Sequence, residues 1–282
     1  MTHIGVIGAG AMGSGIAQVI AEAGYNVTMF DVAPEACNKA LNKLGSNWQK
    51  AVEKGKISAE ERQKRIALVQ AAQDLAEFKE FDLVIEAVAE TIEIKKAVFT
   101  QLDEICSEKT LLVSNTSSLS ITEIGAFTKR PAKVAGMHFF NPVPVMRLVE
   151  IVRGLSTSED TIAEIKSFAD KINKVGVVVN DTPGFIVNRL LVPLCNEAIK
   201  MLEAGVASPQ DIDTAMKLGA NWPMGPFELS DLVGLDVHIG ATASLAKELN
   251  DSHYACARLA RQMYRANHLG RKTGKGFYDY NK

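Results

Sequence analysis

The sequence begins with a short apolar run that leads into a glycine-rich loop. Gly8, Gly10 and Gly13 form the pattern G-x-G-x-x-G between an expected strand, His3–Ile7, and an expected helix, Met12–Ala23. The first glycine permits a tight turn, the second lets the backbone approach a pyrophosphate, and the third allows close helix–strand packing. The helix N-terminus then turns its N–H groups toward the phosphates. This context predicts a dinucleotide site that includes Gly8, Gly10, Met12 and Gly13.

An acidic residue, Asp31, follows the second expected strand, Asn26–Phe30. A carboxylate at this place can accept hydrogen bonds from the ribose hydroxyls of adenosine, and it would repel a 2′-phosphate. The next residues, Val32 to Pro34, include no arginine that could bind such a phosphate. We therefore expect NAD rather than NADP. The alternative is a glycine turn without a ligand beside a surface aspartate, and the joint presence of loop, helix and acid argues against it.

Short β-branched runs alternate with helical stretches over the first two-thirds of the chain. This alternation predicts an α/β fold with a Rossmann-like, doubly wound and mostly parallel sheet. The expected strands are His3–Ile7, Asn26–Phe30, Leu83–Glu86, Leu111–Ser114, Val134–His138, Leu148–Val152 and Val175–Val179. The expected helices are Met12–Ala23, Pro34–Lys54, Ala59–Arg65, Ile92–Cys106 and Glu159–Ile172.

The pattern changes at the turn signal Asp181-Thr182-Pro183-Gly184, after which no strand-like run occurs. We place the domain boundary there, with a dinucleotide-binding domain over residues 1–184 and an all-helical C-terminal domain over 185–282. The expected helices of the second domain are Phe185–Ala204, Pro209–Leu218, Pro226–Leu249 and Tyr254–Asn267.

Composition and charge exclude several classes of protein. The 282 residues suffice for about two domains, and 31 basic against 33 acidic side chains argue against a general nucleic-acid binder. No apolar run approaches the ~20 residues of a membrane span, and the N-terminus does not resemble a signal peptide. The four cysteines are widely spaced, which suggests neither a metal site nor a disulfide framework. We expect a cytoplasmic protein without metal.

A histidine and a glutamate flank a proline-rich turn. His138 closes one β-like run and Glu150 lies in the next, with Pro144 midway between them. If the two runs pair around this turn, His138 and Glu150 become cross-strand neighbours. A hydrogen bond between them would fix the imidazole tautomer and raise its basicity, as a general base requires. The alternative is a satisfied core histidine beside an unrelated glutamate, and spacing alone does not decide between the two.

Three further groups of polar residues have both a functional and a structural interpretation. Asn115 to Ser118 follow a strand at the edge where doubly wound sheets bind ligands, although a serine before Ile121 could simply cap a helix. Asn188 begins the helical domain and could face a ligand or solvent. Lys50 and Lys54 share a helix face that could hold phosphates or could be a solvated basic surface.

Taken together, the motifs identify the chain as similar to the 3-hydroxyacyl-CoA dehydrogenase family over essentially its full length. The residues that carry the resemblance are Gly8–Gly13, Glu86–Glu90, Ser114–Leu119, His138–Val143, Asp181–Arg189, Gly225–Asp231 and Gly270–Tyr278. The resemblance implies hydride transfer between NAD and a 3-hydroxyacyl-CoA, with 3-hydroxybutyryl-CoA and acetoacetyl-CoA as the expected pair. It also implies a homodimer or higher oligomer formed through the helical domain.

The resemblance further implies roles that spacing could not settle. His138 would be the general base, oriented by Glu150, while Ser117 and Asn188 would hydrogen-bond the substrate oxygens. Lys50 and Lys54 would contact the phosphates of coenzyme A. The cofactor site would also include Asp31, Glu90, Lys95, Asn115, Asn141 and Lys275. Two other interpretations stay open, namely a dehydrogenase of a small free hydroxy acid and a non-catalytic dinucleotide-binding protein.

Overall fold

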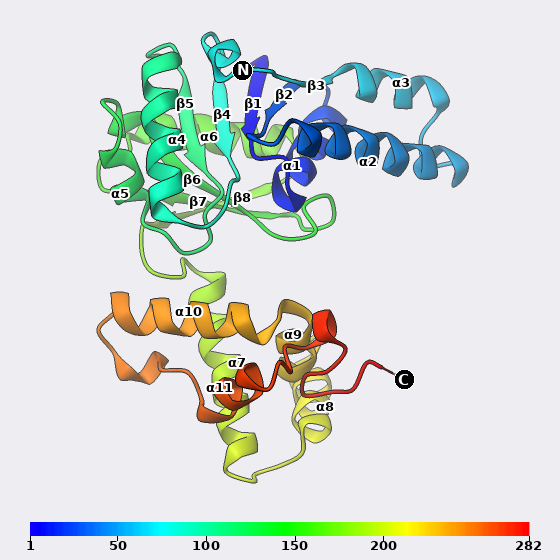
Figure 1. The fold of residues 1–282 in the computed structure, drawn as a ribbon, viewed down its shortest axis with the longest axis vertical. Helices are drawn as coiled ribbons and strands as arrows, with labels where there is room; N and C mark the ends of the chain where they lie inside the picture. The colour runs from blue at the N-terminus through cyan, green and yellow to red at the C-terminus, as the bar shows by residue number, and fades with distance from the viewer. Residues whose placement is uncertain (282) are drawn as a thin grey trace. The chain divides into compact units, whose positions relative to one another are not determined.

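The computed structural model describes residues 1–281, which form two compact units (Figure 1). The first unit is Met1–Thr182, and the second begins at Pro183. The division falls inside the turn segment Asp181–Gly184, slightly before the boundary expected from the sequence.

The first unit contains one eight-stranded sheet. Its order is β3-β2-β1-β4-β5-β6-β7-β8, and β6 and β7 are the only antiparallel neighbours. The chain runs outward from β1 to β3 and then returns to the other side of β1, so the predicted doubly wound sheet is confirmed. The strands are β1 (His3–Ile7), β2 (Asn26–Phe30), β3 (Val69–Ala71), β4 (Leu83–Glu86), β5 (Leu111–Ser114), β6 (Val134–Phe139), β7 (Leu148–Arg153) and β8 (Val175–Asn180).

Amphipathic helices cover this sheet. They are α1 (Ala11–Glu22), α2 (Pro34–Glu53), α3 (Ala59–Ala67), α4 (Ile92–Ile105), α5 (Ile121–Ala126) and α6 (Glu159–Lys171). Ile16 and Ile20 of α1 share one apolar core with Phe168 of α6 and with strand residues such as Ile4. Helix α2 buries Trp48 in the same core, and α3 packs beside α2 as the second arm of a helical hairpin (Figure 1). Because β1, β4, β5 and β6 pair in parallel, their carboxyl ends meet at one edge of the sheet.

The second unit is helical. Its helices are α7 (Val187–Glu203), α8 (Pro209–Gly219), α9 (Pro226–Val233), α10 (Leu235–Glu248) and α11 (Arg258–Arg265). Phe227 and Leu235 lie at the centre of its core and are fully buried. The chain's last described segment packs onto this core because Asp231 accepts hydrogen bonds from the backbone N–H groups of Phe277 and Tyr278, both at 2.9 Å.

Four details differ from the sequence-based expectation. The prediction of a single helix over Pro226–Leu249 is wrong, because Gly234 adopts φ 103° and separates α9 from α10. The helix expected over Tyr254–Asn267 is shorter, since a 3-10 turn at Ser252–Tyr254 precedes it. Strand β3 and helix α5 were not predicted; both are too short to display a clear periodicity.

Residues 1–281 lack three kinds of feature. No helix there is long and apolar enough to cross a membrane. No group of three or more His, Cys, Asp or Glu side chains is placed to hold a metal ion. The four cysteines are not joined by disulfides.

Candidate active site

The glycine loop has the geometry of a nucleotide-binding turn. Gly8 adopts φ 102°, and a Cβ atom there would lie 2.5 Å from the Ala87 carbonyl oxygen. A Cβ atom on Gly13 would lie 1.8 Å from the Gly8 carbonyl oxygen, so both positions require glycine. At Gly10, by contrast, a Cβ atom would meet nothing within 4 Å. Helix α1 starts at the next residue without a side-chain cap, so this open side leaves room for a pyrophosphate at a helix N-terminus.

Asp31 lies beside this loop at the carboxyl end of β2. Its carboxylate accepts hydrogen bonds from the backbone N–H groups of Ala9, at 2.8 Å, and Ala33, at 3.0 Å. A carboxylate offers about four lone-pair directions, so these two bonds fix its position and leave capacity for ribose hydroxyls. The side chain of the next residue, Val32, is 91% exposed and brings no positive charge. The residues present therefore fit NAD.

His138 and Glu150 form a buried pair on β6 and β7. They are direct cross-strand neighbours, and His138 Nδ1 lies 2.7 Å from Glu150 Oε2. Their exposed fractions are 6% and 1%, and the ring of Phe140 packs against the imidazole. The pairing predicted from the proline-rich turn is confirmed. A bond to Nδ1 orients the ring and makes Nε2 the atom suited to proton transfer.

A second polar cluster follows β5, the neighbour of β6. Glu90 Oε1 accepts hydrogen bonds from Thr116 Oγ1 at 2.5 Å and from the backbone N–H of Ser117 at 2.7 Å. Burial alone would raise the pKa of Glu90, but the Lys95 charge and these hydrogen bonds lower it below its ordinary value. Glu90 is thus held as a carboxylate next to Ser117. Ser120 caps α5, so the capping role considered for this serine run belongs to Ser120 rather than Ser117.

Asn115 connects the serine cluster to the histidine strand. Its Oδ1 accepts a hydrogen bond of 2.9 Å from the backbone N–H of Phe139, the residue after His138. Asn141 follows at the start of the turn between β6 and β7, where it is exposed. The carboxyl edge of the sheet therefore brings together the glycine loop, Asp31, the serine cluster and the His138–Glu150 pair.

Comparison with known proteins shows the family. Residues 3–182 match the family described as 3-hydroxyacyl-CoA dehydrogenase, NAD binding domain, and residues 184–280 match the 3-hydroxyacyl-CoA dehydrogenase, C-terminal domain. The chain belongs to the 3-hydroxyacyl-CoA dehydrogenase family. The resemblance expected from the sequence is confirmed, and the first unit is the family's NAD-binding domain.

Individual members of the family match along their full length. The chain is 50% identical to the probable 3-hydroxybutyryl-CoA dehydrogenase of Bacillus subtilis over 99% of this chain and 97% of that protein. It is also 50% identical to the 3-hydroxybutyryl-CoA dehydrogenase of Clostridioides difficile, with 99% of both chains covered. The crystal structure of (S)-3-hydroxybutyryl-CoA dehydrogenase from Ralstonia eutropha matches with a TM-score of 0.98 and 42% identity, covering 100% of both chains.

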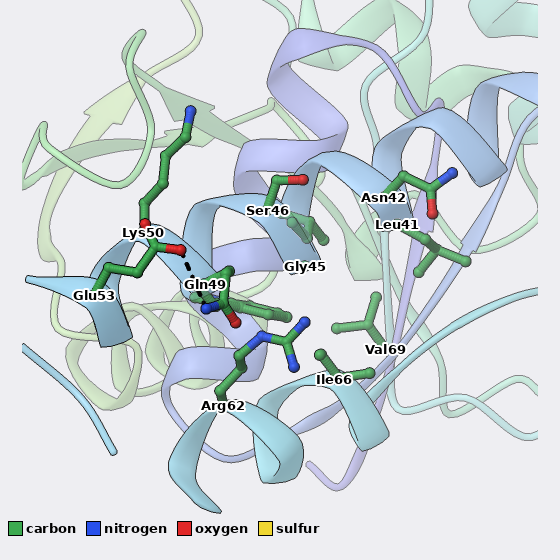
Figure 2. A pocket seen from close by; sticks show the side chains of 12 residues that line it. Leu41, Asn42, Gly45, Ser46, Gln49, Lys50, Glu53, Arg62, Ile66 and Val69 are labelled. Carbon is green, nitrogen blue, oxygen red and sulfur yellow. Dashed lines mark hydrogen bonds between the residues drawn. The ribbon is translucent and has the colours of Figure 1, made fainter. Parts of the chain in front are cut away.

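The remaining predicted site residues of this dehydrogenase belong to other segments of the chain. Lys50 is exposed in the last turn of α2 (Figure 2), and Lys54 caps the C-terminus of that helix, so the shared helix face ends at Lys54. In the second unit, Asn188 lies in the first turn of α7. Lys275 belongs to the C-terminal segment, where its carbonyl accepts a 2.8 Å hydrogen bond from the N–H of Gly270.

One polar residue near the site was given no role from the sequence. Glu86, the last residue of β4, is fully buried and bonds both Lys95 Nζ and Ser114 Oγ. A glutamate that ends an otherwise apolar strand, Leu-Val-Ile-Glu, was the available signal. Its partners come from α4 and β5, and no local pattern connects those segments.

Proposed function

We propose that the protein interconverts (S)-3-hydroxybutyryl-CoA and acetoacetyl-CoA with NAD. The observation that carries this proposal is the buried His138–Glu150 pair on the same sheet edge as the glycine loop and Asp31. A non-catalytic nucleotide-binding protein would need the loop and the aspartate but not a buried histidine–carboxylate pair. The relatives that match along their full length are named as 3-hydroxybutyryl-CoA dehydrogenases, which supports 3-hydroxybutyryl-CoA as the substrate.

In the proposed mechanism, the glycine loop and Asp31 would hold NAD, which would supply the hydride chemistry at carbon 3 of the substrate. His138 accepts the proton of the 3-hydroxyl group in the oxidative direction and returns it to the ketone oxygen in the reductive direction. Glu150 holds the ring through Nδ1, so that Nε2 faces the substrate oxygen, and it stabilises the imidazolium form. Ser117 and Asn188 donate hydrogen bonds to substrate oxygens, which positions carbon 3.

The binding roles are proposed in the same way. The residues assigned to NAD are Gly8, Gly10, Met12, Gly13, Asp31, Glu90, Lys95, Asn115, Asn141 and Lys275. Lys95 is only 1% exposed and bonds Glu86 and Glu90, so it acts by holding Glu90 in place. Lys50 and Lys54 contact the phosphates of coenzyme A at the exposed end of α2.

The direct test is oxidation of NADH by the purified protein with acetoacetyl-CoA, followed by the loss of NADH absorbance. NADPH is run in parallel, together with free acetoacetate in place of the thioester. The expected result is rapid loss of NADH absorbance with acetoacetyl-CoA. Free acetoacetate with NADH, and acetoacetyl-CoA with NADPH, should give little loss. Oxidation of NADH with acetoacetate, or no oxidation with any pair, would contradict the proposed substrate.

We further propose that two copies associate through the helical unit. A groove lined by apolar side chains of α7 and α8 opens on this unit, with Leu194, Ala198, Met201 and Met216 among its walls. On the same two helices, Leu190 is 67% and Leu218 is 82% exposed, which adds apolar surface to this unit. Sedimentation velocity of the wild type and of Met201→Glu tests this; a monomeric wild type would contradict it.

A further inference from the structure

Lys174 is a buried lysine that has no role in the mechanism above. It lies in the short connection between α6 and β8 and is only 6% exposed. Asn173 ends α6 in a left-handed conformation with φ 58°, and the N–H of Lys174 donates a 2.9 Å hydrogen bond to the Ala169 carbonyl. This helix stop fixes the place of Lys174 at the start of β8. A lysine is rarely buried unless its charge has partners, so the contacts of Lys174 indicate its role.

The partners of Lys174 are backbone carbonyls of the turn that connects β6 to β7. Its Nζ atom lies 2.5 Å from the Val143 carbonyl oxygen and 2.8 Å from the Met146 carbonyl oxygen. The N–H groups of Val145 and Met146 both donate to the Pro142 carbonyl at 3.0 Å, so the turn is compact. The ammonium group therefore stabilises the carbonyls of this turn in the way that a lysine stabilises the last carbonyls of a helix.

The same turn packs against the helix of the glycine loop. Val143 is 2% exposed, and a Cβ atom on Gly15 of α1 would lie 3.0 Å from the Val143 Cβ atom. The glycine at this position lets the turn approach α1 closely. Burial lowers the pKa of the Lys174 ammonium, and the charge of Glu22, the last residue of α1, opposes this effect. Val143 thus contacts α1 with its side chain and Lys174 with its carbonyl.

The turn and α1 carry different parts of the proposed NAD site. Asn141, which is assigned to NAD, lies at the start of the turn, three residues after His138. Helix α1 begins at the open side of the glycine loop, where a pyrophosphate fits. In the proposed reaction the nicotinamide lies near His138, whereas the adenosine lies near Asp31. The contact between the turn and α1 consequently sets the distance between the two ends of the site.

We propose that Lys174 is a positioning residue for the nicotinamide half of NAD. By holding the carbonyls of Val143 and Met146, it keeps the turn on α1 and thereby places Asn141. This inference rests on the proposed function, since it specifies how the same cofactor site is held together. Without the ammonium group, the Val143 carbonyl loses its donor and the turn loses its link to the connection before β8. The adenosine half of the site depends on the glycine loop and Asp31, so it stays intact.

A binding test compares the whole dinucleotide with its adenosine half. Lys174→Met removes the charge and keeps an unbranched side chain. In calorimetry, NADH should bind this variant about tenfold more weakly than the wild type, as expected for one lost charge-assisted hydrogen bond, while ADP binding changes less than about twofold. Lys171→Met is the matched control, because it removes an exposed charge from the last turn of α6. Equal weakening of NADH and ADP, or no weakening of either, overturns the proposal.

Gly15→Ala perturbs the same contact from the side of α1. The added methyl group would lie 3.0 Å from Val143, closer than ordinary van der Waals contact, so it displaces the turn. Alanine is also the better helix former, so the variant should fold. NADH should bind about threefold more weakly, and ADP should bind as in the wild type. Unchanged NADH binding in Gly15→Ala overturns the proposal, and this variant carries the test if Lys174→Met does not fold.

Steady-state kinetics separate this inference from the proposed reaction. With acetoacetyl-CoA, Lys174→Met should raise the KM of NADH about tenfold and change the KM of the thioester less than about twofold. An equal rise of both KM values overturns the role of Lys174. Absence of turnover in the wild type, together with the expected NADH and ADP binding in Lys174→Met, instead contradicts the proposed reaction and supports the role of Lys174.

Discussion

Glu86 and Lys95 form a fully buried ion pair between the end of β4 and the first turn of α4. Lys95 Nζ lies 2.7 Å from Glu86 Oε1 and 2.9 Å from Oε2, and the two side chains are 0–1% exposed. Glu86 Oε2 also accepts a 2.6 Å hydrogen bond from Ser114, and Lys95 reaches Glu90 Oε2 at 3.3 Å. The pair thereby joins the carboxyl ends of β4 and β5 to the carboxylate that holds Ser117.

Removal of Lys95 alone is expected to be strongly destabilising. Lys95→Met leaves the Glu86 carboxylate buried without its cation, which costs about 3–5 kcal/mol of unfolding free energy. The double variant Glu86→Gln/Lys95→Met removes both charges and should recover more than half of that loss. Urea unfolding of the wild type, Lys95→Met, Glu86→Gln and the double variant measures these losses. If the losses of Lys95→Met and Glu86→Gln simply add in the double variant, the two residues are not coupled.

His138 and Glu150 should behave as one unit in kinetics. His138→Ala is expected to lower kcat by about 10²–10⁴-fold, the usual contribution of a general acid–base group. Glu150→Gln leaves the ring without its orienting carboxylate and should lower kcat by about 10²-fold. In the His138→Ala background the second change should have almost no further effect.

The matched control for this pair is Glu164→Gln, an exposed carboxylate on α6 that should leave kcat unchanged. Steady-state rates at saturating acetoacetyl-CoA and NADH give all four values. Independent, multiplicative losses from His138→Ala and Glu150→Gln would show that Glu150 does not act through His138.

Local patterns made most of this architecture predictable. Each of the seven expected strands exists, because β-branched runs between helical stretches leave few alternatives. The His138–Glu150 pairing was also accessible, since a short turn around Pro144 fixes the register of the two strands it connects. Gly234 shows the limit: a glycine permits a break inside an apparent helix, but only the packed fold shows that its φ becomes 103° and that the helix divides there.

Contacts between distant segments were beyond this kind of prediction. Glu86 meets Lys95 and Ser114 only because β4, α4 and β5 pack together. A single sequence displays periodicity and spacing, whereas burial and partner geometry depend on the assembled fold. The roles of Ser117, Asn188 and the two lysines of α2 came from family resemblance, not from periodicity.

Asp31 and Val32 should control the choice between NADH and NADPH. Asp31→Ser removes the carboxylate that repels a 2′-phosphate, and Val32→Arg adds a cation at a position that is 91% exposed. The double variant should change the ratio of kcat/KM values about a hundredfold toward NADPH, from lost repulsion plus new charge-assisted bonds.

Asp31→Asn is the control for this change, because it removes the charge and keeps the side-chain shape, with one amide oxygen that still accepts from the N–H of Ala9 or of Ala33. The ratio of its kcat/KM values with NADH and NADPH should lie between the ratios of the wild type and the double variant. Equal coenzyme ratios in all three proteins would show that Asp31 does not face the adenosine ribose.

His238 should make the helical unit sensitive to acid. It is 6% exposed on α10, its Nε2 lies 3.5 Å from Asn196 Oδ1, and burial lowers its pKa from 6.5 to about 4. Between these two values the unfolded chain binds a proton that the folded chain does not bind, so stability falls as the pH falls from 6.5 to 4. At a pH below both pKa values, the lost unfolding free energy reaches about 3 kcal/mol.

His238→Gln removes this titration while keeping a polar side chain toward Asn196. The variant should be less stable than the wild type near neutral pH, but its unfolding free energy should decline less steeply from pH 6.5 to 4. Carboxylates that titrate in the same range contribute equally to both proteins and cancel in the difference. The same substitution at exposed His253 controls for the loss of a histidine. Parallel pH profiles for the wild type and His238→Gln in urea unfolding would mean that His238 binds a proton equally in the folded and the unfolded protein.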